Sequence, residues 1–331
     1  MLILTADEVR KALPMGETIK AMKNAYASLS NGGAAVPLRT QLPIQKREAL
    51  SIFMPAHVDA EGEEALAVKV VSIFPENLKR GQPLIYAAVL VLDPISGKPT
   101  ALLEGSTLTA IRTGASSGAA IDILSRPDSR VLAVFGAGAQ GRTQMEAACS
   151  VRSIDKVWIY DTFPEKAKTL AEEMAGRGEI TQNIQVATTP FEATREADII
   201  CTATTATTPV FKDEDIKPGT HISGIGSYTP EMQEVPPETV LRAYVVVDSR
   251  SATLAEAGDL IQPMRAGTFS ENHIAAELGE IVLKRKPGRQ SPEQITFFKS
   301  VGVAVQDAAA AQLALKNASA MGLGSSVPLL S

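Results

Sequence analysis

The segment that most constrains the fold is a glycine-rich loop between an apolar run and a helical pattern. Gly136, Gly138 and Gly141 follow the run Val131 to Phe135 in the spacing GxGxxG. Such glycines permit a tight turn and let a pyrophosphate approach the backbone at the N-terminus of the next helix. The combination predicts the strand, phosphate loop and helix of a dinucleotide-binding domain, with a glycine turn needed only for packing as the alternative.

A carboxylate stands where such a domain binds the adenosine ribose. The next apolar run, KVWIYD, ends at Asp161, twenty residues beyond Gly141. A carboxylate at this position accepts hydrogen bonds from the ribose hydroxyls and repels a 2′-phosphate. The sequence therefore favours NAD(H) over NADP(H), although Arg142 beside the loop could neutralise a phosphate.

Beyond the loop, short apolar runs alternate with polar helical stretches. Alternation on this scale predicts a doubly wound parallel sheet. The pattern from Ile295 to Ala320 predicts one long helix that could return to the first part of the chain. The apolar runs are 131–135, 157–160, 184–187, 198–201, 221–225 and 244–247.

The N-terminal part of the chain has a different pattern. Thr5 and Glu8 form a capping box, and apolar residues recur at helical spacing between Ile19 and Leu29, so two helices open the chain. A helix rich in Ala, Gly and Ser over 106–124 joins this part to the sheet domain. Apolar or alternating runs at 50–54, 66–74 and 84–92 predict antiparallel strands, and hence an α+β domain.

Composition excludes several classes of protein. The 331 residues include 32 Lys and Arg against 37 Asp and Glu, a net charge of −5, so no basic field for nucleic acid is expected. The apolar run 87–92 is far shorter than the roughly 18 residues of a membrane helix. Nor does the N-terminus have the basic segment of a signal peptide. Cys149 and Cys201, the two cysteines, are typical of a reduced cytoplasm.

Other polar residues indicate little chemistry. His57, His221 and His273 have no metal-ligand spacing among them, so no metal is expected. The sequence has no GxSxG, HExxH or paired catalytic carboxylates, so a hydrolase is not indicated. The acidic segment Glu256 to Leu260 is interpreted as a solvated turn.

Three cations in the N-terminal part suggest an anionic substrate. Lys69 has no acidic residue within four positions, so it either reaches solvent at a strand end or faces a cavity that receives an anion. Arg112 is the only charge between Glu104 and Asp122, and its guanidinium suits a carboxylate, with an ion pair to a distant acid as the alternative. Arg39 is less specific. Beside a nicotinamide, these cations indicate a small carboxylate-bearing substrate.

Four separated motifs stand out in the sequence: TLTAIRTGASSGAA (107–120), FGAGAQG (135–141), VVVDSRSATLAEAGDL (245–260) and ITFFKSVGVAVQDAAAA (295–311). They resemble signatures of the ornithine cyclodeaminase and mu-crystallin family. The resemblance implies a Rossmann domain, residues 114–301, inserted into an α+β substrate-binding and dimerisation domain made of residues 1–113 and 302–331. It also implies a homodimer, which the cysteines and Asp161 predict to be cytoplasmic and to use NAD(H).

The same resemblance assigns the substrate carboxylate to Arg39, Lys69 and Arg112. Because a desolvated lysine has a lowered pKa, Lys69 is the candidate that supplies a proton, with Tyr228 or an ordered water in reserve. The implied cofactor contacts are Arg112, Thr113, Gly136, Ala137, Gly138, Ala139, Gln140, Gly141, Asp161, Thr202, Ile222, Ser223, Gly224, Ile225 and Ser300.

The segment Gly226 to Glu234 departs from the GD-x-P-x-K pattern of ornithine cyclodeaminases. Tyr228 replaces the aspartate that stabilises the cationic end of that substrate, and Met232 replaces the lysine. The resemblance therefore favours NAD(H)-dependent reduction of a cyclic imino acid, Δ1-pyrroline-2-carboxylate or Δ1-piperideine-2-carboxylate, to L-proline or L-pipecolate. The alternatives are alanine dehydrogenase-type amination of a 2-oxo acid, ornithine cyclodeamination, and a non-catalytic binding protein resembling mu-crystallin.

Overall fold

The computed structural model describes residues 1–60 and 63–329, and the chain divides into two compact units. Unit 1 comprises Met1–Arg112 and Val303–Ser331, and unit 2 comprises Thr113–Gly302. Each boundary lies one residue from the one expected from the sequence. Residues 330 and 331, the end of the expected first domain, lie outside the described part.

Unit 1 is built on a mostly antiparallel sheet. The strands pair in the order β16-β1-β7-β6-β5-β4-β2, and β3 also pairs with β4. The antiparallel strands predicted from the sequence are therefore confirmed, whereas the short β1 lies parallel to β7. The bounds are β1 (Leu2–Leu4), β2 (Ala34–Ala35), β3 (Thr40–Ile44), β4 (Ala49–Ala60), β5 (Glu63–Ile73), β6 (Ile85–Leu92), β7 (Pro99–Glu104) and β16 (Ser325–Ser326), with 3-10 turns η1 (Gln45–Arg47) and η2 (Pro75–Arg80).

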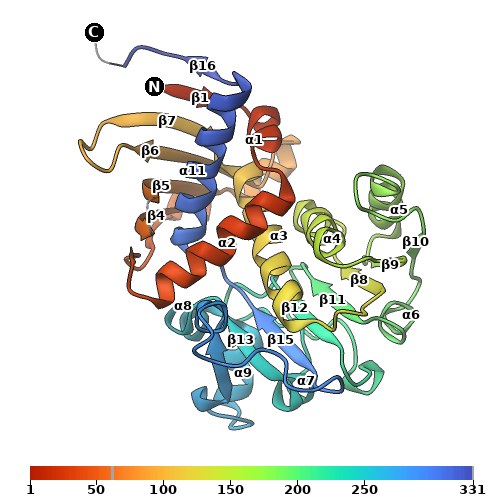
Figure 1. The fold of residues 1–331 in the computed structure, drawn as a ribbon. Coiled ribbons are helices and arrows are strands. Elements are labelled where there is room, and N and C mark those ends of the chain that lie inside the picture. Colours follow the sequence, from red (N-terminus) through yellow and green to blue (C-terminus); the bar gives the residue numbers. More distant parts are fainter. Residues whose placement is uncertain (61–62, 330–331) are drawn as a thin grey trace. The chain divides into compact units, whose positions relative to one another are not determined.

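Helices from both ends of the chain cover this sheet. Helix α1 (Ala6–Ala12) begins at the predicted capping box, where the Thr5 backbone N–H donates to Glu8 at 2.9 Å. Helix α2 (Met15–Ser30) follows, and α11 (Ala304–Met321) packs against both helices and against β4, β5 and β6 (Figure 1). The buried side of α11 is mostly alanine, which lets the helix lie close to the strands. The two chain ends thus share one core.

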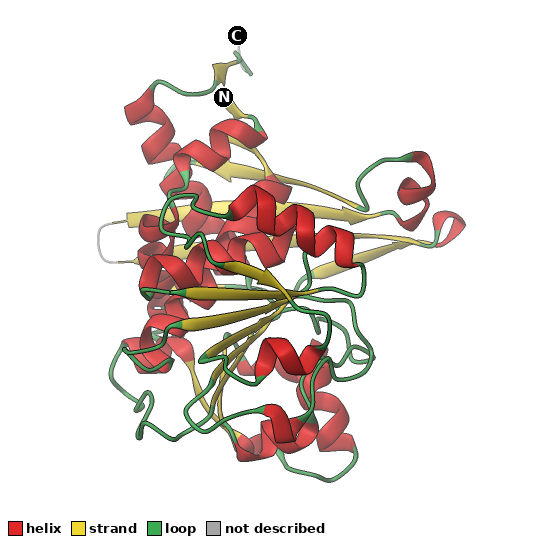
Figure 2. Cartoon of the chain, turned by 90° about the vertical axis from the view of Figure 1, so that its right-hand side faces the viewer, coloured by secondary structure: helices red, strands yellow, loops and turns green. Residues whose placement is uncertain are grey.

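Unit 2 contains a parallel sheet of eight strands in the order β10-β9-β8-β11-β12-β15-β13-β14. Leu132 and Val134 of β8 belong to one core cluster, and Ala133 and Phe135 belong to another, so both faces are buried. Helices lie on both faces (Figure 2), as in the predicted doubly wound Rossmann sheet. The strands are β8 (Val131–Phe135), β9 (Lys156–Tyr160), β10 (Ile184–Val186), β11 (Ile199–Thr202), β12 (His221–Gly224), β13 (Tyr244–Val247), β14 (Ile274–Glu277) and β15 (Thr296–Lys299).

Helix α3 (Gly105–Leu124) continues from unit 1 into unit 2. Within unit 2, a Cβ on Gly114 would lie 2.5 Å from the backbone oxygen of Thr143, so the glycine lets α3 and α4 approach closely. The remaining helices of unit 2 are α4 (Ala139–Val151), α5 (Pro164–Met174), α6 (Pro190–Thr194), α7 (Pro237–Arg242), α8 (Arg250–Glu256), α9 (Gly258–Arg265) and α10 (Leu278–Val282), with 3-10 turns η3 (Asp213–Asp215) and η4 (Glu271–His273).

Two predictions about local structure were wrong. The pattern Ile295 to Ala320 is not one helix, because β15 joins the parallel sheet, Gly302 adopts a φ of +82° and α11 begins only at Ala304. A short apolar run has the same appearance in a buried strand and in a buried helix. The segment Glu256 to Leu260 is not a solvated turn, because Asp259 in the first turn of α9 is fully buried.

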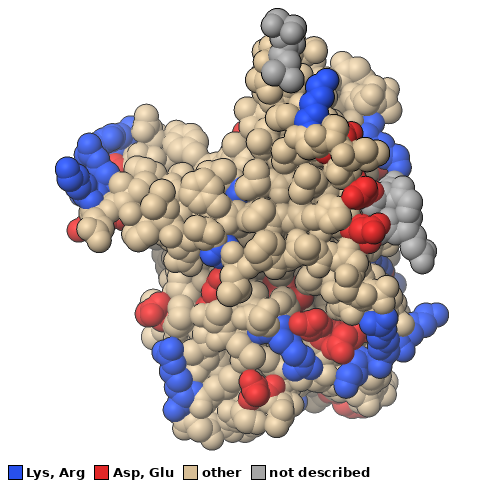
Figure 3. All heavy atoms as spheres, turned by 90° about the vertical axis from the view of Figure 1, so that its left-hand side faces the viewer, with Lys and Arg blue, Asp and Glu red and all other residues tan. Residues whose placement is uncertain are grey.

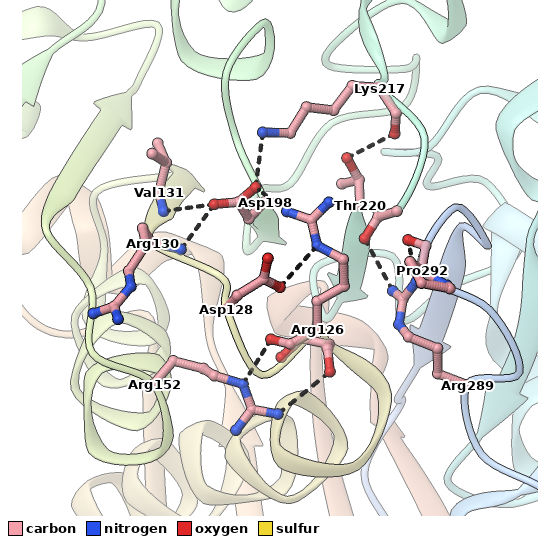
Figure 4. Close-up of polar contacts among 12 residues, drawn as sticks. Arg126, Asp128, Arg130, Val131, Arg152, Asp198, Lys217, Thr220, Arg289 and Pro292 are labelled. Carbon is pink, nitrogen blue, oxygen red and sulfur yellow. Dashed lines mark hydrogen bonds and ion pairs between the residues drawn. The ribbon is translucent and has the colours of Figure 1, made fainter.

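Asp198, just before β11, binds the backbone at the amino end of the neighbouring strand β8 (Figure 4). Its Oδ2 accepts hydrogen bonds from the backbone N–H groups of Arg130 and Val131, at 2.8 and 3.0 Å. Its Oδ1 lies 2.7 Å from both Arg126 Nη2 and Lys217 Nζ. This network lies at the amino ends of β8 and β11, so it stabilises the sheet at the edge opposite the glycine loop.

Charged residues form no extended basic surface on the face of the described residues that Figure 3 shows. Small groups of Lys and Arg alternate there with Asp, Glu and broad uncharged areas. Within the described part of the chain, no helix is long and apolar enough to span a bilayer.

Candidate functional site

Each glycine of the loop between β8 and α4 has a different steric role. Gly136 adopts a φ of +100°, and a Cβ there would lie 2.5 Å from the Ala203 carbonyl oxygen. A Cβ on Gly141 would collide with the Gly136 carbonyl oxygen. At Gly138, by contrast, a Cβ would have no heavy atom of the described residues within 4 Å apart from those of its chain neighbours. The loop therefore has an open side at Gly138, where a pyrophosphate can approach the backbone.

We expect Gly138→Ala to fold normally and to bind NADH weakly. The added methyl group would meet no protein atom, but it would occupy the space that the pyrophosphate needs. The dissociation constant for NADH should rise about tenfold or more, which corresponds to about 1.4 kcal/mol. Fluorescence titration and thermal unfolding measure the two effects. Gly141→Ala is the contrasting variant, because the clash of its methyl group with the Gly136 carbonyl oxygen should lower the melting temperature. Unchanged NADH binding by Gly138→Ala would exclude this side of the loop as the phosphate site.

Asp161 lies directly against the glycine loop, after β9. Its Oδ2 accepts a hydrogen bond from the Ala137 backbone N–H, and its Oδ1 accepts one from Phe163, both at 2.8 Å. Two backbone groups thus fix the carboxylate, and each oxygen keeps a lone pair for a ribose hydroxyl. Arg142, which could have neutralised the 2′-phosphate of NADP(H), instead forms an ion pair with the Glu173 carboxylate.

The other expected cofactor contacts of unit 2 lie mainly at one edge of its sheet. Thr202 ends β11, Ile222 to Ile225 cover most of β12 and the residue after it, and Ser300 follows β15. These three strands are neighbours, and β11 also pairs with β8, which leads into the glycine loop. Ser300 Oγ donates to Asp248 Oδ2 at 2.7 Å. Ligands of doubly wound sheets bind at this carboxyl edge.

Sequence reasoning missed Glu234, a fully buried acid at the same edge. Its Oε1 accepts from the backbone N–H and the hydroxyl of Thr204, at 2.6 and 2.7 Å. Its Oε2 accepts from the Thr202 hydroxyl at 2.8 Å and from the N–H groups of Gly226 and Ser227, at 2.7 and 3.2 Å. One carboxylate therefore joins the segment after β11 to the segment after β12.

Asp259 and Lys299 complete this buried cluster. Asp259 Oδ1 accepts from the backbone N–H groups of Glu234 and Val235, at 2.7 and 3.0 Å, and its Oδ2 lies 3.2 Å from Lys299 Nζ. Burial raises the pKa of Glu234, and Lys299 acts in the opposite direction. The segment containing Tyr228 is thus fixed by two buried acids. Tyr228 is 39% exposed, and partial burial raises the pKa of its phenol.

Lys69 lies in the middle of the unit 1 sheet, between Met54 of β4 and Val89 of β6. Its side chain is 2% exposed, and its Nζ lies 2.7 Å from Asp307 Oδ2. Lys69 is therefore not at a solvent-exposed strand end. Burial, together with Arg112 and Arg39, lowers its pKa to about 8, against the opposite effect of Asp307.

Arg112 is buried and bound to the first turn of α11. Its Nε donates to Asp307 Oδ1 and its Nη1 donates to Gln306 Oε1, both at 2.9 Å. The ion pair with a distant acid, left open by the sequence, is therefore present. Asp307 was missed because it lies 195 residues from Arg112 in the chain. A signal existed, since Asp307 is an acid within the alanine-rich face of a helical pattern.

The doubly wound sheet, the glycine loop and the acid beside it define the class as NAD(H)-dependent oxidoreductases. The sequence profile of the ornithine cyclodeaminase/mu-crystallin family matches residues 1–322. The chain belongs to this family.

Individual relatives match over almost the whole chain. Δ1-Pyrroline-2-carboxylate reductase of Bacillus cereus is 41% identical over 328 residues, 99% of each chain. The structure of Thermococcus litoralis Δ1-pyrroline-2-carboxylate reductase in complex with NADH and L-proline is 44% identical, with a TM-score of 0.93 over 99% of this chain and 100% of that chain. An archaeal alanine dehydrogenase dimer with bound NAD is 32% identical, with a TM-score of 0.91 over 100% and 99%. The cofactor is NAD(H).

Proposed function

We propose that the chain reduces Δ1-pyrroline-2-carboxylate, or its six-membered homologue Δ1-piperideine-2-carboxylate, with NADH to L-proline or L-pipecolate. The buried arrangement of Lys69 and Arg112 on Asp307 carries the proposal, because it presents cationic groups of fixed orientation. Tyr228 leaves the segment after β12 without the acid of ornithine cyclodeaminases. The two similar reductases, at 41% and 44% identity, support the same substrate.

The chain's own residues would bind the substrate and supply a proton. Arg39, Lys69 and Arg112 hold the carboxylate and orient the imine, so that reduction becomes effectively unimolecular. Bound NADH supplies the hydride to the imine carbon. With a pKa of about 8, Lys69 holds a proton at neutral pH that it can give to the imine nitrogen. Tyr228 is the weaker candidate, because burial raises the pKa of its phenol.

Reductive amination of a 2-oxo acid is the second candidate function. The similarity to the archaeal alanine dehydrogenase supports it, and the same cations would bind the carboxylate of pyruvate. A binding protein without turnover, resembling mu-crystallin, is the candidate from another class.

Steady-state oxidation of NADH distinguishes these functions. We expect the cyclic imine alone to support oxidation, and pyruvate with ammonium to support little. Turnover of pyruvate with ammonium but not of the imine would establish the second function. Tight NADH binding without turnover of either substrate would establish the third.

We further propose a cytoplasmic homodimer that assembles through unit 1. Several large apolar side chains of that unit are exposed, and the similar archaeal alanine dehydrogenase is a dimer. Both cysteines are buried and free, which supports a reducing compartment. Among the described residues of unit 1, the exposed large apolar side chains are Leu38, Leu42, Leu78, Ile85, Tyr86, Ile95, Met321, Val327 and Leu329.

We expect the unmodified enzyme to prefer NADH and Asp161→Ser to narrow or reverse this preference. Serine keeps a hydroxyl for the ribose but removes the charge that repels a 2′-phosphate. The ratio of kcat/KM for NADH and NADPH should fall about tenfold, equivalent to about 1.4 kcal/mol. Asp155→Ser, at an exposed acid of the same unit, serves as the control and should leave the ratio unchanged. A native preference for NADPH would refute the role of Asp161.

A further inference from the structure

We propose that Asp307 is a positioning residue that holds Lys69 as an oriented ammonium ion for proton donation. The inference rests on the proposed function, in which Lys69 protonates the imine nitrogen. Asp307 would act through Lys69 and Arg112 and would not itself exchange a proton with the substrate.

The geometry places one carboxylate between two cations. Asp307 lies in the first turn of α11, the helix that packs on β4, β5 and β6. Its Oδ2 lies 2.7 Å from Lys69 Nζ and its Oδ1 lies 2.9 Å from Arg112 Nε. Because each oxygen binds a different cation, the carboxylate cannot rotate without losing both contacts. The ion pair with Asp307 also holds the Lys69 ammonium group in position.

Asp307 is held in place by contacts that do not involve Lys69. The neighbouring Gln306 accepts hydrogen bonds at Oε1 from the Val303 backbone N–H at 2.7 Å and from Arg112 Nη1 at 2.9 Å. Its Nε2 donates to the buried Tyr26 hydroxyl at 2.5 Å. These bonds fix the start of α11, so the Asp307 carboxylate is positioned before any substrate binds.

Among the described residues, Asp307 is the acid that opposes the effect of burial on Lys69. The charged groups that face Lys69 are Asp307 from α11, Arg112 from α3 and Arg39 from the segment before β3. Burial and the two arginines favour the neutral amine, and Asp307 favours the ammonium form. Burial acts to raise the pKa of Asp307, but Arg112 and Lys69 bring it below its ordinary value. The acid is therefore ionised at neutral pH and can retain the proton on Lys69.

Lys69 can donate a proton to the imine nitrogen and then be reprotonated. An ammonium group has three N–H donors, so if its ion pair with Asp307 engages one of them, two remain for the substrate. One proton passes from Nζ to the imine nitrogen, and the bonding electron pair stays on Nζ. The neutral amine then regains a proton from water.

The test follows the titration of Lys69 in the cofactor-free protein by NMR of its ¹³Cε resonance, assigned by its loss in Lys69→Arg. In Asp307→Asn we expect the midpoint to fall by about one pH unit or more. The alkaline limb of the pH profile of kcat/KM should move to lower pH by a similar amount. Asp307→Glu keeps the charge and should restore most of both values.

Asp198→Asn is the matched control. Asp198 is also a buried acid between a lysine and an arginine, but it belongs to the structural network of unit 2 (Figure 4). Its removal should lower stability and leave the Lys69 titration unchanged. An unchanged titration in a folded Asp307→Asn would overturn the inference.

A measurement on the unmodified protein covers the case in which Asp307→Asn does not fold. The ¹³Cγ resonance of Asp307 should shift with the same midpoint as Lys69, because the two groups are in contact. A ¹³Cγ chemical shift that does not change as Lys69 titrates would refute the inference. Both NMR measurements need neither cofactor nor substrate. If Lys69 titrates as expected but the protein does not reduce the imine, only the proposed function is refuted. If the protein reduces the imine but Asp307→Asn leaves the Lys69 titration unchanged, only the role of Asp307 is refuted.

Discussion

Replacing Arg112 with lysine should lower kcat/KM for Δ1-pyrroline-2-carboxylate about 30-fold or more, equivalent to about 2 kcal/mol of transition-state binding. The guanidinium uses two different nitrogens to bind Asp307 and Gln306. An ammonium group is a single centre that cannot reproduce this fork or bind a carboxylate through parallel bonds. Charge alone is therefore insufficient, and the substrate would lose its orientation.

The measurement compares steady-state kinetics and thermal unfolding of Arg112→Lys and the unmodified enzyme. Arg10→Lys, at an exposed position of α1, is the matched control and should change neither. A folded Arg112→Lys with unchanged kcat/KM would show that the ion pair with Asp307 is purely structural.

The fold was predictable from the sequence where its signals are local. GxGxxG after an apolar run, the acid that follows the next run, and the alternating runs of unit 1 each depend on nearby residues. The division between β15 and α11 was missed, because Ile295 to Ala320 is apolar on both sides of the break and Gly302 alone marks the change.

The candidate site was only partly predictable. Lys69 and Arg112 were identified because they stand alone in apolar or small-residue segments. Their partner Asp307 was missed because only the return of the C-terminal helix to unit 1 brings it to them. Glu234 and Asp259 were missed for a related reason. Their roles depend on backbone N–H groups of separate loops, which side-chain patterns do not reveal.

The largest substrate effect is expected for L-ornithine, which the enzyme should not convert measurably to proline and ammonia. The side-chain ammonium of ornithine would enter the site without the acid that ornithine cyclodeaminases carry at the position of Tyr228, and an unpaired buried charge is costly. A cyclic imine has no second ammonium group, and its carboxylate still meets Arg39, Lys69 and Arg112. The difference should exceed about a thousandfold in kcat/KM, or about 4 kcal/mol.

Tyr228→Asp tests this explanation. Glu234 and Asp259 fix the surrounding backbone through main-chain contacts, so the substitution should alter the side chain without moving the segment. We expect weak ornithine turnover at most, since Met232 still replaces the lysine of the ornithine cyclodeaminase pattern.

The most direct measurement follows the products of the unmodified enzyme with two substrates. With NADH and Δ1-pyrroline-2-carboxylate, we expect one L-proline formed for each NADH oxidised. With L-ornithine and catalytic NAD, we expect no release of ammonia. Robust ammonia release from ornithine, without reduction of the imine, would contradict the proposed function and establish a cyclodeaminase instead.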